Sequence, residues 1–238
     1  MMQLLSFTNA TKAYADGARA LRVLDSVSLD LARGTSVGVY GTRGAGKSTL
    51  LRLAAGLELA DSGSVRFEGR DMAGMTSGER AWLRRGAIAF IAAEDWRPLA
   101  GESVMDHLCA GPLGEGVPVH QARLRAQRAL DQVEFRSGAA AETAALSLSC
   151  RSRVMLARAL VQEPRLLIID EPAVMPSIGD RDRFYALLRR AVRERRISLL
   201  AASEEIAALQ GLDVLVSLAA GELCSTEPAG VVVPFPSV

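Results

Sequence analysis

The chain has 238 residues, of which 49% are hydrophobic and 23% are charged, a balance that suits a folded protein and excludes intrinsic disorder. Its 28 basic and 27 acidic residues give a net charge of +1, and only 5% of residues are aromatic, which argues against nucleic acid as a partner. No apolar run reaches the ~20 residues of a membrane span and no signal peptide is recognisable, so a cytoplasmic location is expected.

The first forty residues predict short strands separated by turns. Turn signals are present at Asp16-Gly17 and at Arg33-Gly34. The turns separate three apolar or alternating segments, which are 4–11, 27–31 and 36–40. After Tyr40 the pattern becomes helical, because leucines form a stripe over residues 50–57.

The rest of the chain alternates predicted strands with predicted helices. Residues from about 95 to 160 are rich in Ala, Arg and Leu and are expected to be mostly helical. Short apolar runs predict strands at 63–67, 88–91, 166–169, 198–201 and 214–216. This alternation favours an α/β fold, in which a parallel sheet forms the core and a helical lobe is inserted.

A phosphate-binding loop follows the strand predicted at 36–40. Its nine residues fit the pattern G-x-x-x-x-G-K-[ST] and are Gly41, Thr42, Arg43, Gly44, Ala45, Gly46, Lys47, Ser48 and Thr49. Backbone N–H groups of such a loop form an anion nest, to which the following helix adds its dipole. We expect Lys47 to reach the β- and γ-phosphates and the Ser48 hydroxyl to bind Mg²⁺. The alternative is a glycine-rich turn that matches the pattern by chance.

Two carboxylates follow the apolar run at 166–169. Asp170 stands at the end of this predicted buried strand, where a carboxylate is expected to hold the Mg²⁺ ion, through water. Glu171 is the candidate catalytic residue, placed to orient or deprotonate an attacking water. A solvated strand-end carboxylate is the plain alternative for Asp170, and the phosphate loop upstream makes it the weaker one.

These motifs, with the run Arg151 to Leu160, Pro164 and the tripeptide Asp170-Glu171-Pro172, resemble the ATP-binding subunits of ATP-binding cassette (ABC) transporters. The resemblance covers nearly the whole chain. Tyr14 matches the aromatic residue that the family stacks on adenine, although an ordinary half-buried tyrosine would also fit. The segments Met75-Thr76-Ser77 and Leu83-Arg84-Arg85 are similar to those of the lipoprotein-release, macrolide-export and cell-division-type subset.

The resemblance implies a P-loop NTPase fold, with a RecA-like parallel core, an N-terminal antiparallel β subdomain and an inserted helical subdomain. We therefore expect one ABC-type ATP-binding domain over residues 1–238. Its core with the β subdomain is expected to comprise about 1–92 and 162–226, its helical subdomain about 93–161, and its surface tail 227–238.

Four elements of the family pattern are altered in this chain. The signature motif L-S-G-G-Q is replaced by residues 146–150, so that Ser147 is kept while Leu148 and Ser149 stand where the glycines belong. Ala93 occupies the position of the glutamine that meets Mg²⁺ and the attacking water, and Ser203 that of the switch histidine. The stretch 173–177 lacks the family's aspartate.

The family works as head-to-tail dimers that hold ATP and Mg²⁺ between one phosphate loop and the partner's signature motif. The altered elements therefore imply ATP binding with weak hydrolysis. The expected partners are a membrane permease, which is the chain's only membrane contact, and a second ATP-binding subunit, a heterodimer being favoured. A competent transport ATPase, in which Ser203 or Glu204 substitutes through water, and a soluble regulatory or scaffold protein without a permease are the alternatives.

Two further groups of residues have a plain and a functional interpretation. Five arginines at 189, 190, 193, 195 and 196 are interpreted as the solvated end of a helix, with anion binding as the alternative. Trp96 and Leu99 follow Ala93 in a segment that, in the family, lines the groove for the membrane subunit. A tryptophan in the protein's own core is an equal alternative for Trp96.

Overall fold

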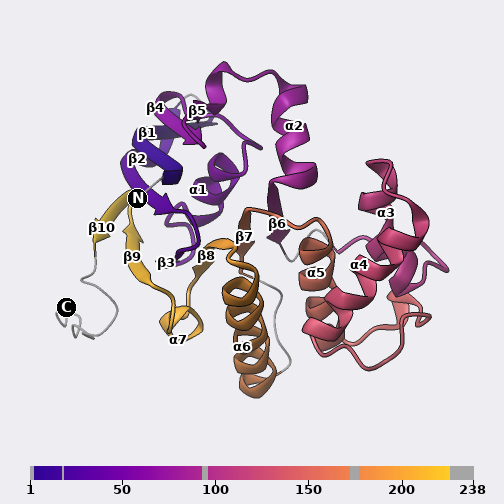
Figure 1. Ribbon diagram of the computed structural model, residues 1–238. Coiled ribbons are helices and arrows are strands. Elements are labelled where there is room, and N and C mark those ends of the chain that lie inside the picture. Colours follow the sequence, from indigo (N-terminus) through magenta and orange to yellow (C-terminus); the bar gives the residue numbers. More distant parts are fainter. Residues whose placement is uncertain (1–2, 18, 93–95, 172–176, 226–238) are drawn as a thin grey trace.

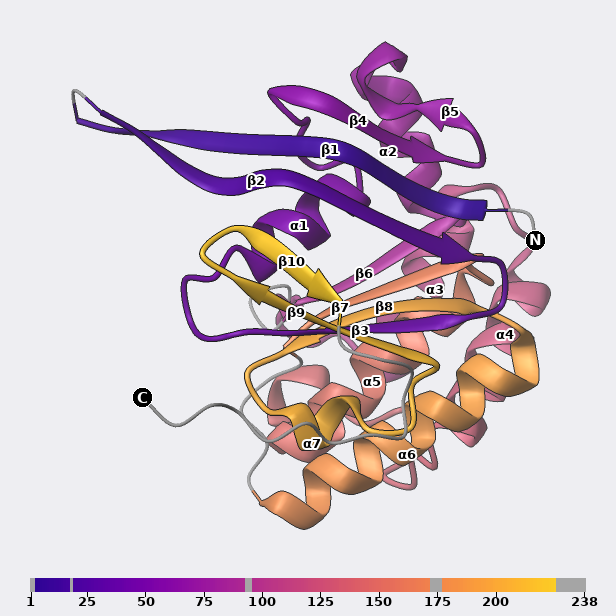
Figure 2. The same ribbon diagram turned by 90° about the vertical axis from the view of Figure 1, so that its left-hand side faces the viewer.

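The computed structural model describes residues 3–17, 19–92, 96–171 and 177–225, and it contains two β-sheets (Figure 1). The first sheet is antiparallel and has the strand order β2-β1-β4-β5. Its strands are β1 (Gln3–Asp16), β2 (Arg19–Ala32), β4 (Ser62–Phe67) and β5 (Arg70–Asp71). Figure 2 shows β1 and β2 as a long hairpin that extends beyond the rest of the sheet.

The second sheet forms the centre of the molecule and has the strand order β10-β9-β3-β8-β7-β6. Every neighbouring pair is parallel except β9 and β10. The strands are β3 (Ser36–Tyr40), β6 (Ile88–Ala92), β7 (Leu166–Asp170), β8 (Ser198–Ser203), β9 (Val214–Ala219) and β10 (Glu222–Ser225). The apolar runs of β7 and β8 are buried because helices and the first sheet cover both faces.

Helices of the core flank this sheet. Helix α1 (Lys47–Ala54) lies between the two sheets, where it contacts β2, β7 and β8. On the other face, α5 (Leu148–Val161) and α6 (Ile178–Arg195) pack with the short α7 (Ile206–Leu209). Two hydrophobic clusters result, one around α1 and one around α5 and α6.

The remaining helices surround the edge strand β6. Helix α2 (Ser77–Gly86) begins with a capping box between Thr76 and Glu79, and it leads into β6. Helices α3 (Val104–Gly114) and α4 (Val119–Gln132) pack with α5 on the side away from the antiparallel sheet (Figure 1). Among the described residues, two single 3₁₀ turns complete the helical elements, at Met72–Gly74 and Thr143–Ala145.

The expected α/β fold with an antiparallel N-terminal sheet is confirmed. The first two strands are longer than predicted, because register shifts at four places along β1 let the hairpin accommodate polar residues that interrupt the alternating pattern. The subdomain limits stay a prediction, and the tail 227–238 lies outside the described residues. Among the helices that the structure describes, none is both long enough and apolar enough to cross a membrane.

Candidate nucleotide-binding site

The phosphate loop connects the carboxyl end of β3 to the first residue of α1. Gly46 precedes the helix in the left-handed region, at φ 103°, and Gly44 has φ 80°, so both positions favour glycine. No side chain caps the start of α1 and no acidic residue lies in its first turn. The first N–H groups of this helix are therefore available to an anion.

Two glycines of the loop are also required by packing. A Cβ atom on Gly41 would lie 2.5 Å from the carbonyl oxygen of Leu218, and one on Gly46 would lie 2.7 Å from that of Val23. Both distances are shorter than any ordinary contact. A Cβ on Gly44, by contrast, would meet nothing within 4 Å. The back of the loop is thus pressed against β2 and β9, while Gly44 faces open space.

Lys47 is buried, and its amino group is held by the loop itself. Nζ donates hydrogen bonds to the carbonyl oxygens of Gly41, at 2.8 Å, and of Thr42, at 3.0 Å. It also forms an ion pair with Glu204, whose Oε1 lies 3.5 Å away. The side chain of Lys47 is 7% exposed, whereas that of Glu204 is 41% exposed.

The two carboxylates predicted at the end of β7 lie beside the end of β8. Asp170 is half-buried and is the last residue of β7, opposite Ala92 on one side and Ala202 on the other. Glu171 has φ 37°, a left-handed conformation that turns the chain away from the strand. Its Oε1 accepts a hydrogen bond of 3.0 Å from the backbone N–H of Glu204. Glu171 and Lys47 therefore both contact Glu204, which places them on the same side of the molecule at the ends of β7 and β3.

Ser203, at the position of the family's histidine, is buried. Its Oγ accepts a hydrogen bond of 3.0 Å from the backbone N–H of Glu205. Burial raises the pKa of Tyr185 to about 12; the charge of Glu171 acts in the same direction and the nearby Ser203 hydroxyl opposes it. The Ser203 hydroxyl is thus engaged within the protein's own core, while its carbonyl accepts from the Gly41 N–H at 3.4 Å.

Tyr14 reaches the phosphate loop from the far part of β1. Its hydroxyl donates to Glu58 and lies 3.4 Å from the Thr49 hydroxyl, the last residue of the loop motif. Lys12 lies over the ring, with Nζ 5.7 Å from the ring centre. Partial burial and the bond to Glu58 raise the pKa of the Tyr14 phenol, which therefore stays neutral at physiological pH. The ring is half-buried and lies at the edge of the loop.

The altered signature segment begins α5, in the other part of the molecule. Ser147 caps this helix by accepting a 3.3 Å hydrogen bond from the Cys150 N–H. Leu148 is 45% exposed. The Ser149 hydroxyl donates to Asp180 at 3.0 Å. The bond from Ser177, and then this bond from Ser149, lower the pKa of the Asp180 carboxyl. Ser149 thus ties α5 to the start of α6.

Sequence reasoning alone missed two partners, Glu58 and Asp180. Neither belongs to a recognised motif, and each meets its partner only through the folding of segments more than 30 residues apart. Ala93 and residues 172–176 of the predicted site lie outside the described residues. Trp96 is half-buried, with its ring 5.3 Å from that of His107, whereas Leu99 is 71% exposed.

The residues present fit Mg·ATP. The loop supplies free N–H donors and a buried ammonium group, and Ser48, in the first turn of α1, is only half-buried. Asp170 lies at the same edge of the sheet, since the carboxyl ends of β3 and β7 both flank that of β8. These are the donor types that triphosphate and Mg²⁺ require.

Comparison with known proteins gives the same picture. A family model described as ABC transporter matches residues 24–174. The lipoprotein-releasing system ATP-binding protein LolD of Roseobacter denitrificans is 35% identical over 222 residues, covering 92% of this chain and 97% of that protein. The macrolide export ATP-binding/permease protein MacB 1/2 of Paracoccus denitrificans is 29% identical over 95% of this chain, which spans only 34% of that protein. The dimeric structure of a bacterial ABC transporter cassette superposes with a TM-score of 0.87 at 22% identity, over 96% of this chain and 100% of that one, a likeness of fold.

Proposed function

The chain belongs to the ABC transporter family, and from this membership we propose that it is the ATP-binding subunit of a transporter complex. It binds Mg·ATP at Gly41 to Thr49 and passes the resulting conformational change to a membrane permease. The observation that carries this proposal is the buried Lys47, whose ammonium group is held at the mouth of an uncapped helix. A buried ammonium is costly unless it serves an anion or a fixed partner.

The roles of the individual residues follow from their places. Lys47 and the N–H groups of Gly44, Gly46 and α1 hold the phosphates, and Tyr14 lies where an adenine can stack. Ser48 and Asp170 hold the metal ion, which when bound neutralises charge that develops on the phosphates. Glu171 orients the attacking water. The Glu204 N–H fixes one oxygen of this carboxylate and leaves the other for that task.

We further propose that hydrolysis by this chain is weak. The Ser203 hydroxyl supports this, because it is 3% exposed and already accepts from the Glu205 N–H, and its short side chain does not carry the ring nitrogens of the histidine. Ala93 carries no polar group for the metal or the water. Loss of one donor to a transition state costs on the order of 10²–10³ in rate. The competent ATPase is therefore the weaker alternative.

The partners proposed are a permease and a second ATP-binding chain, with a heterodimer favoured. A dimer is supported by Leu148, which is 45% exposed at the start of α5, where the family binds its partner's ATP. A concave surface of about 270 Å³ between α2, β6 and α5, lined by residues such as Phe90, Met155 and Arg158, is the candidate permease contact. The lipoprotein-releasing relatives make a permease of that class the first to test.

The proposal is tested by nucleotide binding to the variant Lys47→Ala. We expect isothermal calorimetry with Mg·ATP to give an affinity at least tenfold lower than that of the unaltered chain, because a charge-assisted hydrogen bond contributes about 1.5–3 kcal/mol. Arg70→Ala is the control, since it also removes a positive charge and Arg70 pairs with Glu79 at the edge of the antiparallel sheet. Equal affinities in the Lys47 variant and the unaltered chain would contradict the site.

A further inference from the structure

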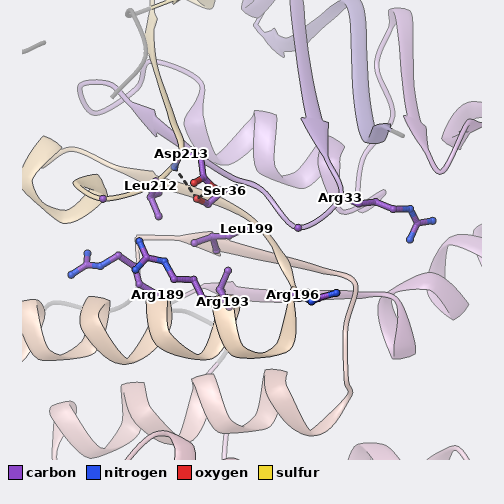
Figure 3. A pocket seen from close by; sticks show the side chains of 11 residues that line it. Arg33, Ser36, Arg189, Arg193, Arg196, Leu199, Leu212 and Asp213 are labelled. Atoms are coloured by element: carbon purple, nitrogen blue, oxygen red, sulfur yellow. Dashed lines mark hydrogen bonds between the residues drawn. The ribbon is translucent and has the colours of Figure 1, made fainter. Parts of the chain in front are cut away.

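A second cavity lies at the opposite end of the parallel sheet from the phosphate loop. It has a volume of about 390 Å³, within the range of small-ligand sites. Three separate segments line it: the start of β3 with Ser36, the carboxyl half of α6 with the residues that follow it, and the segment before β9 with Leu212 and Asp213 (Figure 3). Because β3 has five residues at about 3.3 Å each, roughly 15 Å separates this cavity from the phosphate loop.

Arginines dominate the charge of this cavity. Arg189, Arg193 and Arg196 line it from α6 and its end. Figure 3 shows the side chains of Arg189 and Arg193 between α6 and the segment of Leu212 and Asp213. The Arg189 guanidinium is held there by a 3.0 Å hydrogen bond to the Gln210 carbonyl, and its stem lies against Gly211.

Among the described residues that line the cavity, the one acidic residue does not neutralise these arginines. Asp213 Oδ2 accepts hydrogen bonds from both the N–H and the hydroxyl of Ser36, at 2.8 and 2.6 Å. Arg33 also borders the cavity, but it pairs with Glu68, and Figure 3 shows it pointing away. Within the described part of the chain, no carboxylate forms an ion pair with Arg189, Arg193 or Arg196.

The other side of α6 gives the contrast. There, Arg183 and Arg190 both pair with Glu134, at 2.8 and 3.3 Å. Arg195, like Arg189, donates to a backbone carbonyl, that of Leu160. The contrast is therefore one of ion pairs: Glu134 neutralises Arg183 and Arg190 on one side of α6, and no described carboxylate does so on the side that faces the cavity.

A favourable interaction with the helix dipole does not account for this arrangement by itself. Cations near a helix C-terminus gain about 0.3–1 kcal/mol, but Arg189 lies more than a turn before the end. Arg189 and Arg193 are also four residues apart, and like charges at this spacing destabilise a helix by about 0.2–0.5 kcal/mol. An anion in the cavity would remove this repulsion.

We propose that this cavity is a binding site for a small phosphate-bearing anion. A guanidinium group matches phosphate oxygens with paired donors, and the two charges of Arg189 and Arg193 balance a group of charge near −2. The apolar side chains of Val192, Leu199 and Leu212 form the rest of the wall. The site is separate from the ATP site and does not depend on the function proposed above.

Inorganic pyrophosphate, titrated by calorimetry without metal ions at low salt, tests this site. We expect two binding events per chain. In the double variant R189Q/R193Q, the pyrophosphate affinity of one event should fall at least tenfold. In Lys47→Ala, the affinity of the other event should fall instead. The matched control is R183Q/R190Q, which removes the same charge from the other side of α6 and should change the affinity by less than twofold.

Unchanged pyrophosphate binding in R189Q/R193Q would overturn the proposal, and so would an equal loss in R183Q/R190Q. Circular dichroism and melting temperature check that each variant folds. Sedimentation with phosphatidylglycerol vesicles distinguishes the source of the phosphate. Retention that is lost only in R189Q/R193Q assigns the site to a lipid headgroup, and pyrophosphate binding without retention assigns it to a soluble ligand. Binding of neither probe to the unaltered chain also refutes the site.

Discussion

At the scale of single residues, Glu204 connects the two halves of the nucleotide site. Its side chain approaches the Lys47 ammonium group, and its backbone N–H holds the carboxylate of Glu171. A phosphate that binds Lys47 must compete with the Glu204 carboxylate. We therefore expect the Glu204 side chain to weaken nucleotide binding, while its backbone N–H holds Glu171 in place.

Replacing Glu204 with Gln should tighten ATP binding by about two- to fivefold. The gain is modest because the Glu204 side chain is 41% exposed, and ion pairs open to solvent contribute up to about 1 kcal/mol. A fluorescent ATP analogue measures the change. Glu205→Gln is the control, since Glu205 pairs with Arg181 and not with Lys47. An affinity that is unchanged or lower in Glu204→Gln would show that the two groups do not compete.

The residues of the candidate site that the sequence suggests are those that belong to a contiguous motif. The loop Gly41 to Thr49 and the pair Asp170-Glu171 can be recognised because their spacing along the chain is itself the chemical requirement. The contact of Lys47 with Glu204 joins residues 157 positions apart and depends on β8 lying next to β3. No pattern of neighbouring residues carries that information.

At the scale of elements, α3 buries a titratable group. His107 is 5% exposed; its Nδ1 donates to Glu102 Oε2 at 3.0 Å, and in the described part of the protein its Nε2 has no hydrogen-bond partner. Burial lowers the pKa of His107, the bond to Glu102 opposes this, and the charge of Arg158 adds to it. The folded protein therefore favours the neutral imidazole.

Stability should consequently fall as the pH decreases below about 6.5, the ordinary pKa of histidine. In that range the unfolded chain binds the proton that folded His107 refuses, so the free energy of unfolding decreases with decreasing pH. In His107→Gln, urea denaturation between pH 7 and 5 should show a shallower dependence on pH. His120→Gln, which alters an exposed histidine, should keep the dependence of the unaltered chain. Parallel curves for all three proteins would contradict the prediction.

The sequence predicts which segments form strands more accurately than it predicts how long the strands are. The apolar runs of β6, β7 and β8 specify buried parallel strands, and the structure matches them within one or two residues. The hairpin of β1 and β2 was underestimated, because Asn9 and Ser26 adopt positive φ and interrupt the alternation. Such irregular positions are stabilised by the partner strand, which a local pattern does not include.

At the scale of the whole molecule, the phosphate loop and the start of α5 belong to two different parts of the fold. The loop leads into α1, which lies between the two sheets, whereas α5 packs with α3, α4 and α6. In the dimer that we propose, each part serves a different ATP. The crowding at Leu148 and Ser149 would then affect the partner's site, and the loss of histidine and glutamine would affect the chain's own.

We expect the purified chain to hydrolyse ATP far more slowly than the ~10 s⁻¹ that is typical of enzymes. Turnover near 10 s⁻¹ by the unaltered chain would refute the weak-hydrolysis proposal.

Changing both Leu148 and Ser149 to Gly should increase ATP-dependent self-association about tenfold, because it removes two Cβ atoms from the partner's γ-phosphate. Sedimentation velocity with and without Mg·ATP measures this. Ser149→Ala is the control that loses the bond to Asp180 but keeps a Cβ atom.

The packing behind the phosphate loop has a consequence for how this sequence can evolve. A side chain at Gly41 or Gly46 would collide with the backbone of Leu218 or Val23, whether or not the loop ever meets a ligand. Selection for folding alone therefore preserves these two glycines. Gly44 faces open space, and its positive φ is tolerated by asparagine at a small cost. In descendants that no longer bind ATP, Gly44 and Lys47 would be substituted first. Gly41 and Gly46 would remain, because the fold requires them even after the activity is lost.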